Sequence, residues 1–358
     1  MLSFPDRAAA NVACAPKTSH SYDDQPMPTP LTLREQLNQF FRLLRENGVD
    51  SPRLSAEVLL ASALGLERNE LLKRLLLAPD APLAEQDTLQ AERLVARRAK
   101  GEPVAYIIGN KEFYGRDFSV SPATLTPRPE TELLVDLALE EMRQRPGSGL
   151  FADFGTGTGC IAISLALARP DWRGSALDIS PEALQVAIRN ARRYGTRNVR
   201  FIQADFTTPP FALESLDLLV SNPPYVSEAE YAVLSREVRN FEPKSALVPA
   251  WPRQKDVSLP ARRSVKPNSE ELAAEQTGCD FFPAGKSSGL EHALVILAEA
   301  TRLLKPGGRL LMEIGHRQAQ ALLGKAREAI WSEAHIYKDL AGLDRVFSVR
   351  KRHCHRTS

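Results

Sequence analysis

Residues 150–160 have the sequence LFADFGTGTGC, an apolar segment followed by three glycines at alternate positions. The apolar segment predicts a short buried strand, and the glycines predict a tight turn into a helix over residues 160–168. Because glycine has no Cβ, such a turn also lets a ligand approach the backbone closely. The G-x-G-x-G spacing differs from the G-x-G-x-x-G of dinucleotide folds, and the Lys-Ser/Thr of a phosphate loop is absent. A tight turn without a ligand is the alternative interpretation.

Strand-like and helix-like segments alternate on the C-terminal side of this turn. Strands are expected at residues 150–154, 175–178, 199–204, 216–220, 309–314, 336–340 and 346–350. Helices are expected at residues 132–145, 181–194, 290–304 and 318–330, with a turn at residues 305–308. This alternation predicts an α/β domain whose mostly parallel sheet is covered by helices on both faces.

A small helical bundle is predicted before this domain, over residues 31–100, because apolar residues recur there at steps of three and four. Residues 101–125 are rich in β-prone side chains, which predicts a β-hairpin linking the bundle to the domain at residues 126–358. The proline-rich residues 1–30 predict a disordered leader. Residues 250–286 combine four prolines with mixed charges, which predicts an atypical insertion in the α/β domain.

Composition narrows the class of protein. The chain has 358 residues, 43% of them hydrophobic, and its 46 Lys and Arg nearly balance 44 Asp and Glu. Residues 31–112 carry 12 basic and 12 acidic side chains, so a large basic surface for nucleic acid is not indicated. No run of 18 apolar residues predicts a membrane span. The four cysteines form no C-x-x-C pair, which argues against a metal site and a disulfide framework, and the N-terminus lacks the apolar region of a secretory signal. We therefore expect a cytoplasmic protein.

Acidic residues follow three consecutive predicted strands. Asp153 could hold the ammonium group of an amino acid, and Asp178 could accept hydrogen bonds from both hydroxyls of a ribose. Capping the next helix is the alternative role for Asp178, but Ser180 is the better cap and leaves Asp178 free. Asp205 and Phe206 could bind the amine and the face of an adenine, or be a loop acid and a core aromatic. Together they predict a pocket for S-adenosyl-L-methionine, with the candidate residues Asp153, Gly155, Thr156, Gly157, Thr158, Gly159, Asp178, Asp205 and Phe206.

The sequence SNPPY at residues 221–225 directly follows an apolar strand-like segment. Two consecutive prolines fix the backbone and remove two amide donors, so the carbonyl groups there can point into a site. The Asn222 side-chain oxygen and the Pro223 carbonyl oxygen can both accept hydrogen bonds from a planar NH2 group, which the Tyr225 ring can cover. A strand-ending turn is the alternative. We expect Asn222, Pro223 and Tyr225 to be catalytic, all of residues 222–225 including Pro224 to bind substrate, and Asn222 also to contact the cofactor.

The chemistry that this pattern suits is methyl transfer to a weakly nucleophilic nitrogen. An amide or base amine nitrogen reacts poorly because its lone pair is delocalised. Acceptors that hold both hydrogens in a fixed geometry raise the electron density on nitrogen and aim its lone pair at a sulfonium methyl group. No general base is needed before transfer, since the product can lose its proton afterwards.

The chain resembles the class I S-adenosylmethionine-dependent methyltransferases and, more closely, the PrmC (HemK-like) family of peptide chain release factor glutamine methyltransferases. The resemblance covers about residues 31–249 and 289–350. It rests on YIIG at 106–109, FYG at 113–115, TPRPETE at 126–132, DFGTGTGC at 153–160, DISPEAL at 178–184, SNPPY at 221–225, and DLAG at 339–342 with Asp344 and Arg345.

This resemblance implies a Rossmann-like domain with a mostly parallel seven-stranded sheet, preceded by the helical bundle and linking hairpin. It also implies methylation of the glutamine side-chain amide in the Gly-Gly-Gln motif of bacterial release factors, which the bundle would bind. Residues 155–159 would form the glycine loop, Asp178 would hold the ribose, Phe206 would lie at the adenine and residues 222–225 would hold the glutamine. The family has a short Gly-Gly-x-Asp-Gly-Leu stretch where residues 250–286 intervene here.

Two other functions remain open on the sequence. Asn-Pro-Pro-Tyr is shared with DNA adenine and rRNA guanine methyltransferases, which would need a basic groove or a base-flipping pocket. A binding module without turnover, blocked by the insertion, is the third possibility. We expect a release factor as the protein substrate, no direct contact with nucleic acid or membrane, no metal, and a monomer.

Overall fold

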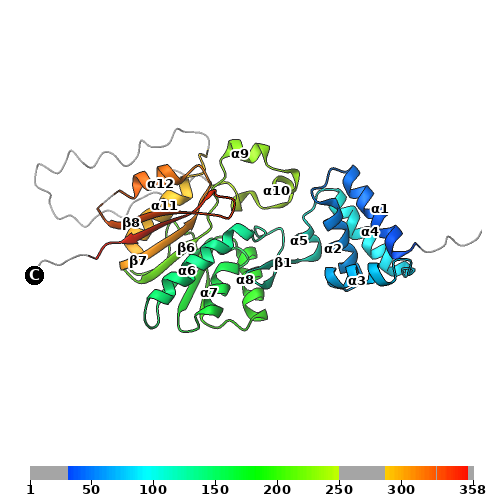
Figure 1. Cartoon of the computed structure of the whole chain (residues 1–358). Coiled ribbons are helices and arrows are strands. Elements are labelled where there is room, and N and C mark those ends of the chain that lie inside the picture. The colour runs from blue at the N-terminus through cyan, green and yellow to red at the C-terminus, as the bar shows by residue number, and fades with distance from the viewer. Residues whose placement is uncertain (1–30, 250–286, 328, 354–358) are drawn as a thin grey trace, which may run out of the picture.

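The protein consists of a helical bundle and a larger α/β domain, joined by a short helix and a β-hairpin (Figure 1). The computed structural model describes residues 31–249 and 287–353, apart from residue 328. The predicted leader at residues 1–30 and the predicted insertion at residues 250–286 lie outside the described residues.

Four helices form the bundle: α1 (Leu33–Glu46), α2 (Pro52–Ala63), α3 (Arg68–Leu77) and α4 (Glu85–Ala99). Helix α1 begins at a capping box, in which the Thr32 hydroxyl accepts from the Glu35 N–H and the Glu35 carboxylate accepts from the Thr32 N–H. The apolar faces of the helices meet in a core that includes Leu37, Phe40, Leu59, Leu60, Leu71 and Val95. The predicted helical region is confirmed.

The segment between the bundle and the α/β domain is only partly a hairpin. Strands β1 (Asn110–Phe113) and β2 (Arg116–Ser119) pair antiparallel as predicted, but the β-prone residues before them form helix α5 (Val104–Ile108). Ile107 packs into the bundle core, and the Tyr106 hydroxyl donates to the Thr124 carbonyl. Burial against the bundle therefore overrides the extended preference of these side chains.

A seven-stranded sheet forms the centre of the α/β domain, in the order β5-β4-β3-β6-β7-β9-β8. Its strands are β3 (Leu150–Phe154), β4 (Arg173–Asp178), β5 (Val199–Gln203), β6 (Leu216–Ser221), β7 (Leu304–Glu313), β8 (Trp331–Lys338) and β9 (Asp344–Lys351). The first five run parallel, and β9 pairs antiparallel with β7 and β8. The strand order reverses between β3 and β6, which is where ligands bind in open α/β sheets.

Helices cover both faces of this sheet, as predicted (Figure 1). Helices α6 (Glu132–Gln144), α7 (Cys160–Ala168) and α8 (Pro181–Arg193) pack on the face that carries Phe151 and Val220. Helices α11 (Glu291–Leu303) and α12 (Ala319–Lys325) pack on the other face, against Ala152 and Leu219. The alternation of side chains along each strand thus supplies two apolar layers to one sheet.

Three local expectations in this domain are wrong. Residues 305–308 do not form a separate turn but belong to β7, whose pairing with β6 shifts register between Leu216 and Leu218. The helix expected at residues 318–330 ends at Lys325, because the chain must reverse before Trp331 begins β8. Helices α9 (Glu228–Val233) and α10 (Arg236–Phe241) follow the SNPPY motif where no element was expected.

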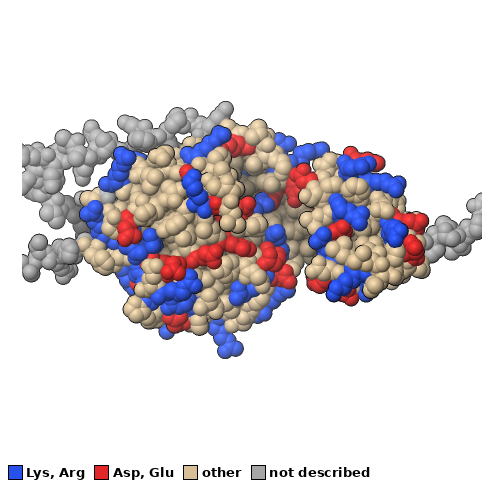
Figure 2. All heavy atoms as spheres, viewed as in Figure 1, with Lys and Arg blue, Asp and Glu red and all other residues tan. Residues whose placement is uncertain are grey.

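Lys and Arg are interspersed with Asp and Glu over the face shown in Figure 2, on the bundle and on the α/β domain alike. Figure 2 also shows this face hollowed between the two domains.

None of the helices in the described residues has the length and apolar character needed to cross a membrane. Within the same residues, no group of His, Cys, Asp or Glu side chains is arranged to hold a metal ion.

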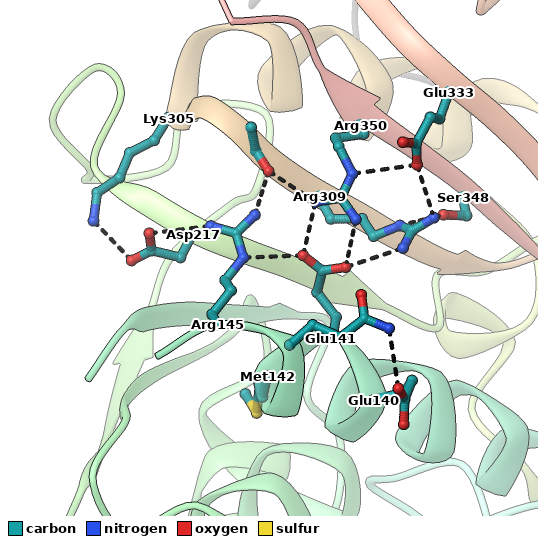
Figure 3. Close-up of polar contacts among 12 residues, drawn as sticks. Glu140, Glu141, Met142, Arg145, Asp217, Lys305, Arg309, Glu333, Ser348 and Arg350 are labelled. Atoms are coloured by element: carbon teal, nitrogen blue, oxygen red, sulfur yellow. Dashed lines mark hydrogen bonds and ion pairs between the residues drawn. The ribbon is translucent and has the colours of Figure 1, made fainter. Parts of the chain in front are cut away.

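A buried ion-pair cluster joins α6 to strands β7 and β9 (Figure 3). The Glu141 carboxylate accepts hydrogen bonds from Arg145 at 2.9 Å, from Arg309 at 3.0 Å and from Arg350 at 2.8 and 2.9 Å. Its side chain is 1% exposed. Burial alone would raise the pKa of Glu141, but the hydrogen bonds from Arg350 and Arg145 outweigh burial and hold that pKa below its ordinary value.

Candidate active site

The glycine loop at residues 155–159 closes the C-terminal end of β3 and opens helix α7. Gly155, Gly157 and Gly159 have φ values of 73°, 54° and 79°, which side chains other than glycine rarely adopt. A Cβ on Gly159 would lie 3.1 Å from the Ala187 Cβ, so this glycine also permits close packing of α8. At Gly155 and Gly157 no heavy atom lies within 4 Å of that position. The loop therefore presents open backbone to a ligand.

Asp153 holds this loop from the inside. Its side chain is fully buried, and Oδ2 accepts a hydrogen bond of 2.7 Å from the Thr156 hydroxyl, while the Thr156 N–H donates to the Leu177 carbonyl. Burial raises the pKa of Asp153 to about 7. The predicted contact between Asp153 and an ammonium group stays a prediction, because the contact present here is structural support of the loop.

Asn190 ties the loop to the hairpin. It is fully buried, and its Nδ2 donates to the Thr158 carbonyl at 2.9 Å and to the Ser119 carbonyl at 3.0 Å. Its Oδ1 accepts from the Ser119 N–H at 2.8 Å. One side chain on α8 thus satisfies three backbone groups and fixes the position of the buried Thr158.

Asp178 lies at the end of β4, beside the same loop. Its Oδ2 accepts from the Gly157 N–H at 2.8 Å, and its Oδ1 accepts from the Ser180 N–H at 2.9 Å. Ser180 caps α8 as expected by accepting from the Ala183 N–H, but the expectation that Asp178 is left free is wrong. Burial raises its pKa, against the hydrogen bonds from Ser180 and Gly157. Each carboxylate oxygen keeps a further lone pair with which it could accept a ligand hydroxyl.

Asp205 and Phe206 follow β5 at the same edge of the sheet. Asp205 is exposed and accepts from the Thr207 N–H at 2.8 Å. The half-buried Phe206 ring stacks on Phe154, with 6.2 Å between ring centroids, and meets the His292 ring edge-on at 5.0 Å. The aromatic side chain is therefore held by the core on one side while its acidic neighbour faces solvent.

The SNPPY motif lies directly beside the glycine loop. Ser221 is the register partner of Phe154 in the parallel pair of β6 and β3, and its hydroxyl donates to the Phe154 carbonyl at 2.7 Å. Asn222 and Gly155, the next residues on the two strands, therefore leave the same sheet edge about one strand spacing apart, roughly 5 Å. The two motifs that sequence reasoning linked are brought together.

The side chains of the motif are fixed by a polar network. The Asn222 Nδ2 donates to the Thr131 hydroxyl at 3.1 Å, and that hydroxyl donates to Glu313 at 2.6 Å. The Tyr225 hydroxyl donates to the same carboxylate at 3.2 Å. Burial and the negative charge of Glu313 raise the pKa of Tyr225, which therefore stays protonated.

The backbone of the motif is equally constrained. Pro223 is buried and Pro224 half-buried, and the Tyr225 carbonyl accepts from the Gln318 Nε2 at 3.0 Å. A Cβ on Gly289, which has a φ of 87°, would come within 2.4 Å of that carbonyl oxygen. Glycine is therefore required where the chain re-enters the described structure after residue 286.

Comparisons with known proteins identify the family in which these features occur. The model of the PrmC N-terminal domain matches residues 35–109, and a methyltransferase domain model matches residues 151–344. A release factor glutamine methyltransferase of Nitratidesulfovibrio vulgaris is 46% identical over 323 residues, which cover 89% of this chain and 95% of the relative. The chain belongs to the release factor glutamine methyltransferase family.

Two further members match a similar share of this chain at lower identity. Release factor glutamine methyltransferases of Moorella thermoacetica and Geobacter sulfurreducens are 38% and 35% identical, and each match covers 90% of this chain. The matches span 99% and 98% of those relatives. The predicted fold, a Rossmann-like methyltransferase domain preceded by a helical region, is confirmed for this family member.

Sequence reasoning missed two residues that the structure joins to Asn222 in the candidate site, Thr131 and Glu313. Thr131 belongs to the TPRPETE motif at residues 126–132, but the sequence alone indicated no role for it. In the structure it is the last residue of the 3-10 turn η1 (Pro129–Thr131). Glu313 is an acid at the end of the otherwise apolar run LLME, and it is 1% exposed. A charged residue inside a buried strand is the signal that could have identified it.

The helices after the motif connect the methyltransferase domain to the bundle. Arg98 of α4 pairs with Glu237 of α10 at 2.7 Å. Arg128, which precedes the η1 turn, donates to both carboxylate oxygens of Glu242 at 2.8 and 2.7 Å. In Figure 1, α9 and α10 lie between the two domains, above the hairpin. The bundle and the candidate site are therefore linked through Glu237 and Glu242, which lie in and just after α10.

Proposed function

We propose that this protein methylates the side-chain amide nitrogen of the glutamine in the Gly-Gly-Gln motif of peptide chain release factors, with S-adenosyl-L-methionine as the methyl donor. The observation that carries this proposal is the register of β3 and β6, which sets Asn222 next to the glycine loop. Family membership supports the choice of a release factor over a nucleic acid, and so does the balance of charge on the bundle.

The residues around the glycine loop fit S-adenosylmethionine. Gly155 and Gly157 offer open backbone where side chains would otherwise stand, and Asp178 has acceptor capacity left for ribose hydroxyls. Asp205 and Phe206 would meet the adenine. When bound, S-adenosylmethionine supplies a methyl group on a positively charged sulfur, and the electron pair of the broken carbon–sulfur bond stays on sulfur.

The chain's own residues act on the substrate amide. The Asn222 Oδ1 and the Pro223 carbonyl would accept the two hydrogens of the glutamine NH2 group, since the Asn222 Nδ2 is engaged by Thr131. The Tyr225 ring, anchored through its hydroxyl to Glu313, would cover the flat amide. This holds the nitrogen lone pair toward the methyl group, and the nitrogen then loses one proton to water after the new bond forms.

Mass spectrometry of a bacterial release factor after incubation with the protein and S-adenosylmethionine tests this function. We expect one added methyl group on the Gly-Gly-Gln glutamine and none on DNA or rRNA in a parallel reaction. Methyl transfer to nucleic acid with an unmodified release factor would overturn the proposal.

Asp178→Ala should weaken S-adenosylmethionine binding by about 10-fold to 100-fold, the effect of losing hydrogen bonds to a charged group. The same change also frees the Gly157 N–H that Asp178 now holds. Calorimetric titration of each variant with S-adenosylmethionine measures the effect. Asp171→Ala is the matched control, because Asp171 pairs with Arg169 at an exposed position in the turn before β4. An unchanged dissociation constant for Asp178→Ala would remove this residue from the cofactor site.

A further inference from the structure

Three segments far apart in the sequence meet in the polar network behind Asn222. Asn222 follows β6, Thr131 ends η1, and Glu313 ends β7. Thr131 and Glu313 are 2% and 1% exposed, so water does not replace the hydrogen bonds between them. The order of donation is Asn222 to Thr131 and Thr131 to Glu313.

This order fixes the orientation of the Asn222 amide. A hydroxyl has one proton to give, and an ionised carboxylate can only accept. The distance of 2.6 Å between Thr131 and Glu313 is typical of a hydroxyl bonded to a charged oxygen. The Thr131 oxygen is then left with lone pairs only, so it must face the NH2 group of Asn222 and not its oxygen. The Asn222 Oδ1 is consequently turned away from Thr131.

The hydrogen bonds around Glu313 have the arrangement that an ionised carboxylate requires. Both of its oxygens are used as acceptors, one by Thr131 and the other by Tyr225. Burial raises the pKa of Glu313 above its ordinary value, and the Thr131 hydrogen bond and the positive charge of Arg345 offset only part of that rise. Arg345 is held in place by Asp339, whose carboxylate accepts from it at 3.0 Å.

We propose that Thr131 and Glu313 are positioning residues that present the Asn222 oxygen to the substrate and so make the site selective for a carboxamide over a carboxylate. The proposal rests on the proposed function. An oxygen facing the substrate attracts the NH2 group of glutamine and repels the oxygens of glutamate. A rotated Asn222 amide would reverse that preference, because its own NH2 group would then face the substrate.

Thr131→Val and Thr131→Ser test this role as a pair. Val keeps the shape of Thr131 but has no hydroxyl, so the Asn222 amide can occupy both orientations. Ser keeps the hydroxyl and should keep the orientation. We expect Thr131→Val to lower kcat/KM for a release factor by about tenfold, the effect of one hydrogen bond, and Thr131→Ser to stay near wild type.

The preference for carboxamide provides a readout that loss of folding does not mimic. A release factor that carries Glu in place of the motif's Gln should inhibit Thr131→Val more strongly than it inhibits the wild type or Thr131→Ser. Glu313→Gln should change the preference in the same direction, since a Gln NH2 group would donate to Thr131 and leave its proton for the Asn222 oxygen. The dissociation constant of S-adenosylmethionine and the melting temperature are recorded for every variant.

The outcomes separate the two proposals. If Thr131→Val and Glu313→Gln both keep the wild-type ratio of Gln to Glu affinity, the positioning role is overturned. If the wild-type protein does not methylate the release factor at all, the proposed function fails first, and the Gln-to-Glu binding ratio of the variants still tests the orientation of Asn222.

Discussion

Asn222→Ala should lower the turnover of release factor methylation by about 10²-fold to 10³-fold, the range for removing one preorganised group from a reaction centre. The Asn222 oxygen is one of two acceptors that hold the glutamine NH2 group, and Thr131 already orients it before the substrate arrives. Because the glycine loop and Asp178 are untouched, the affinity for S-adenosylmethionine should remain nearly unchanged. Methyl incorporation into a release factor at saturating substrates gives turnover, and calorimetry gives the cofactor affinity.

Gln144→Ala is the matched control for this variant. It removes another carboxamide, at an exposed position where Gln144 only donates to Glu140 at the end of α6. Its turnover should equal that of the wild type. Wild-type turnover in Asn222→Ala would refute the catalytic role of Asn222, whereas an equal loss of cofactor affinity would show that Asn222 serves the cofactor more than the amide.

Glu141→Ala should lower the free energy of unfolding by about 3–5 kcal/mol, the usual cost of removing one partner from a buried ion pair. Glu141 accepts from Arg145, Arg309 and Arg350, and its loss leaves three guanidinium groups crowded together without their shared carboxylate (Figure 3). Chemical denaturation followed by circular dichroism measures the change.

Glu140→Ala provides the comparison on the same helix. Glu140 pairs with Arg143 on the surface, where both side chains are more than half exposed, so its loss should cost less than about 1 kcal/mol. If Glu141→Ala were as stable as Glu140→Ala, the cluster would not hold α6 to β7 and β9.

The stability contributed by Glu141 depends on pH in a definite direction. Its folded-state pKa lies below the ordinary value of 4.5, so the contribution is present above pH 4.5 and is lost as the pH falls through the folded-state pKa. The difference in unfolding free energy between the wild type and Glu141→Gln should therefore narrow as the pH falls below 4.5. A constant difference from pH 7 to pH 3 would contradict this assignment.

Local patterns in the sequence predicted most of the fold. Helix α7 has the predicted bounds, because glycines end one apolar run and Arg169 follows the next. Helix α5 was not predicted, because its β-prone residues are held helical by burial against the bundle. Helix α9 was missed although Ser227 and Glu230 form a capping box that the sequence displays.

The candidate site was likewise predictable only in part from the sequence. The glycine loop and SNPPY were recognisable because each motif is continuous and follows an apolar strand. The Thr131–Glu313 hydrogen bond joins residues 182 positions apart, and the Asn222–Thr131 bond joins residues 91 positions apart. No spacing rule predicts such contacts, since only the order of strands in the finished sheet brings these residues together.

The place of β6 in the sheet has a consequence for the nascent chain. β6 pairs with β3, yet β4 and β5 are synthesised between them, and Ser221 reaches Phe154 across 67 residues. A nascent chain that ends before residue 216 contains the glycine loop but lacks the SNPPY motif that would bind the amide. Glu313 is synthesised later still. The candidate site is therefore complete only after residue 313 has been synthesised.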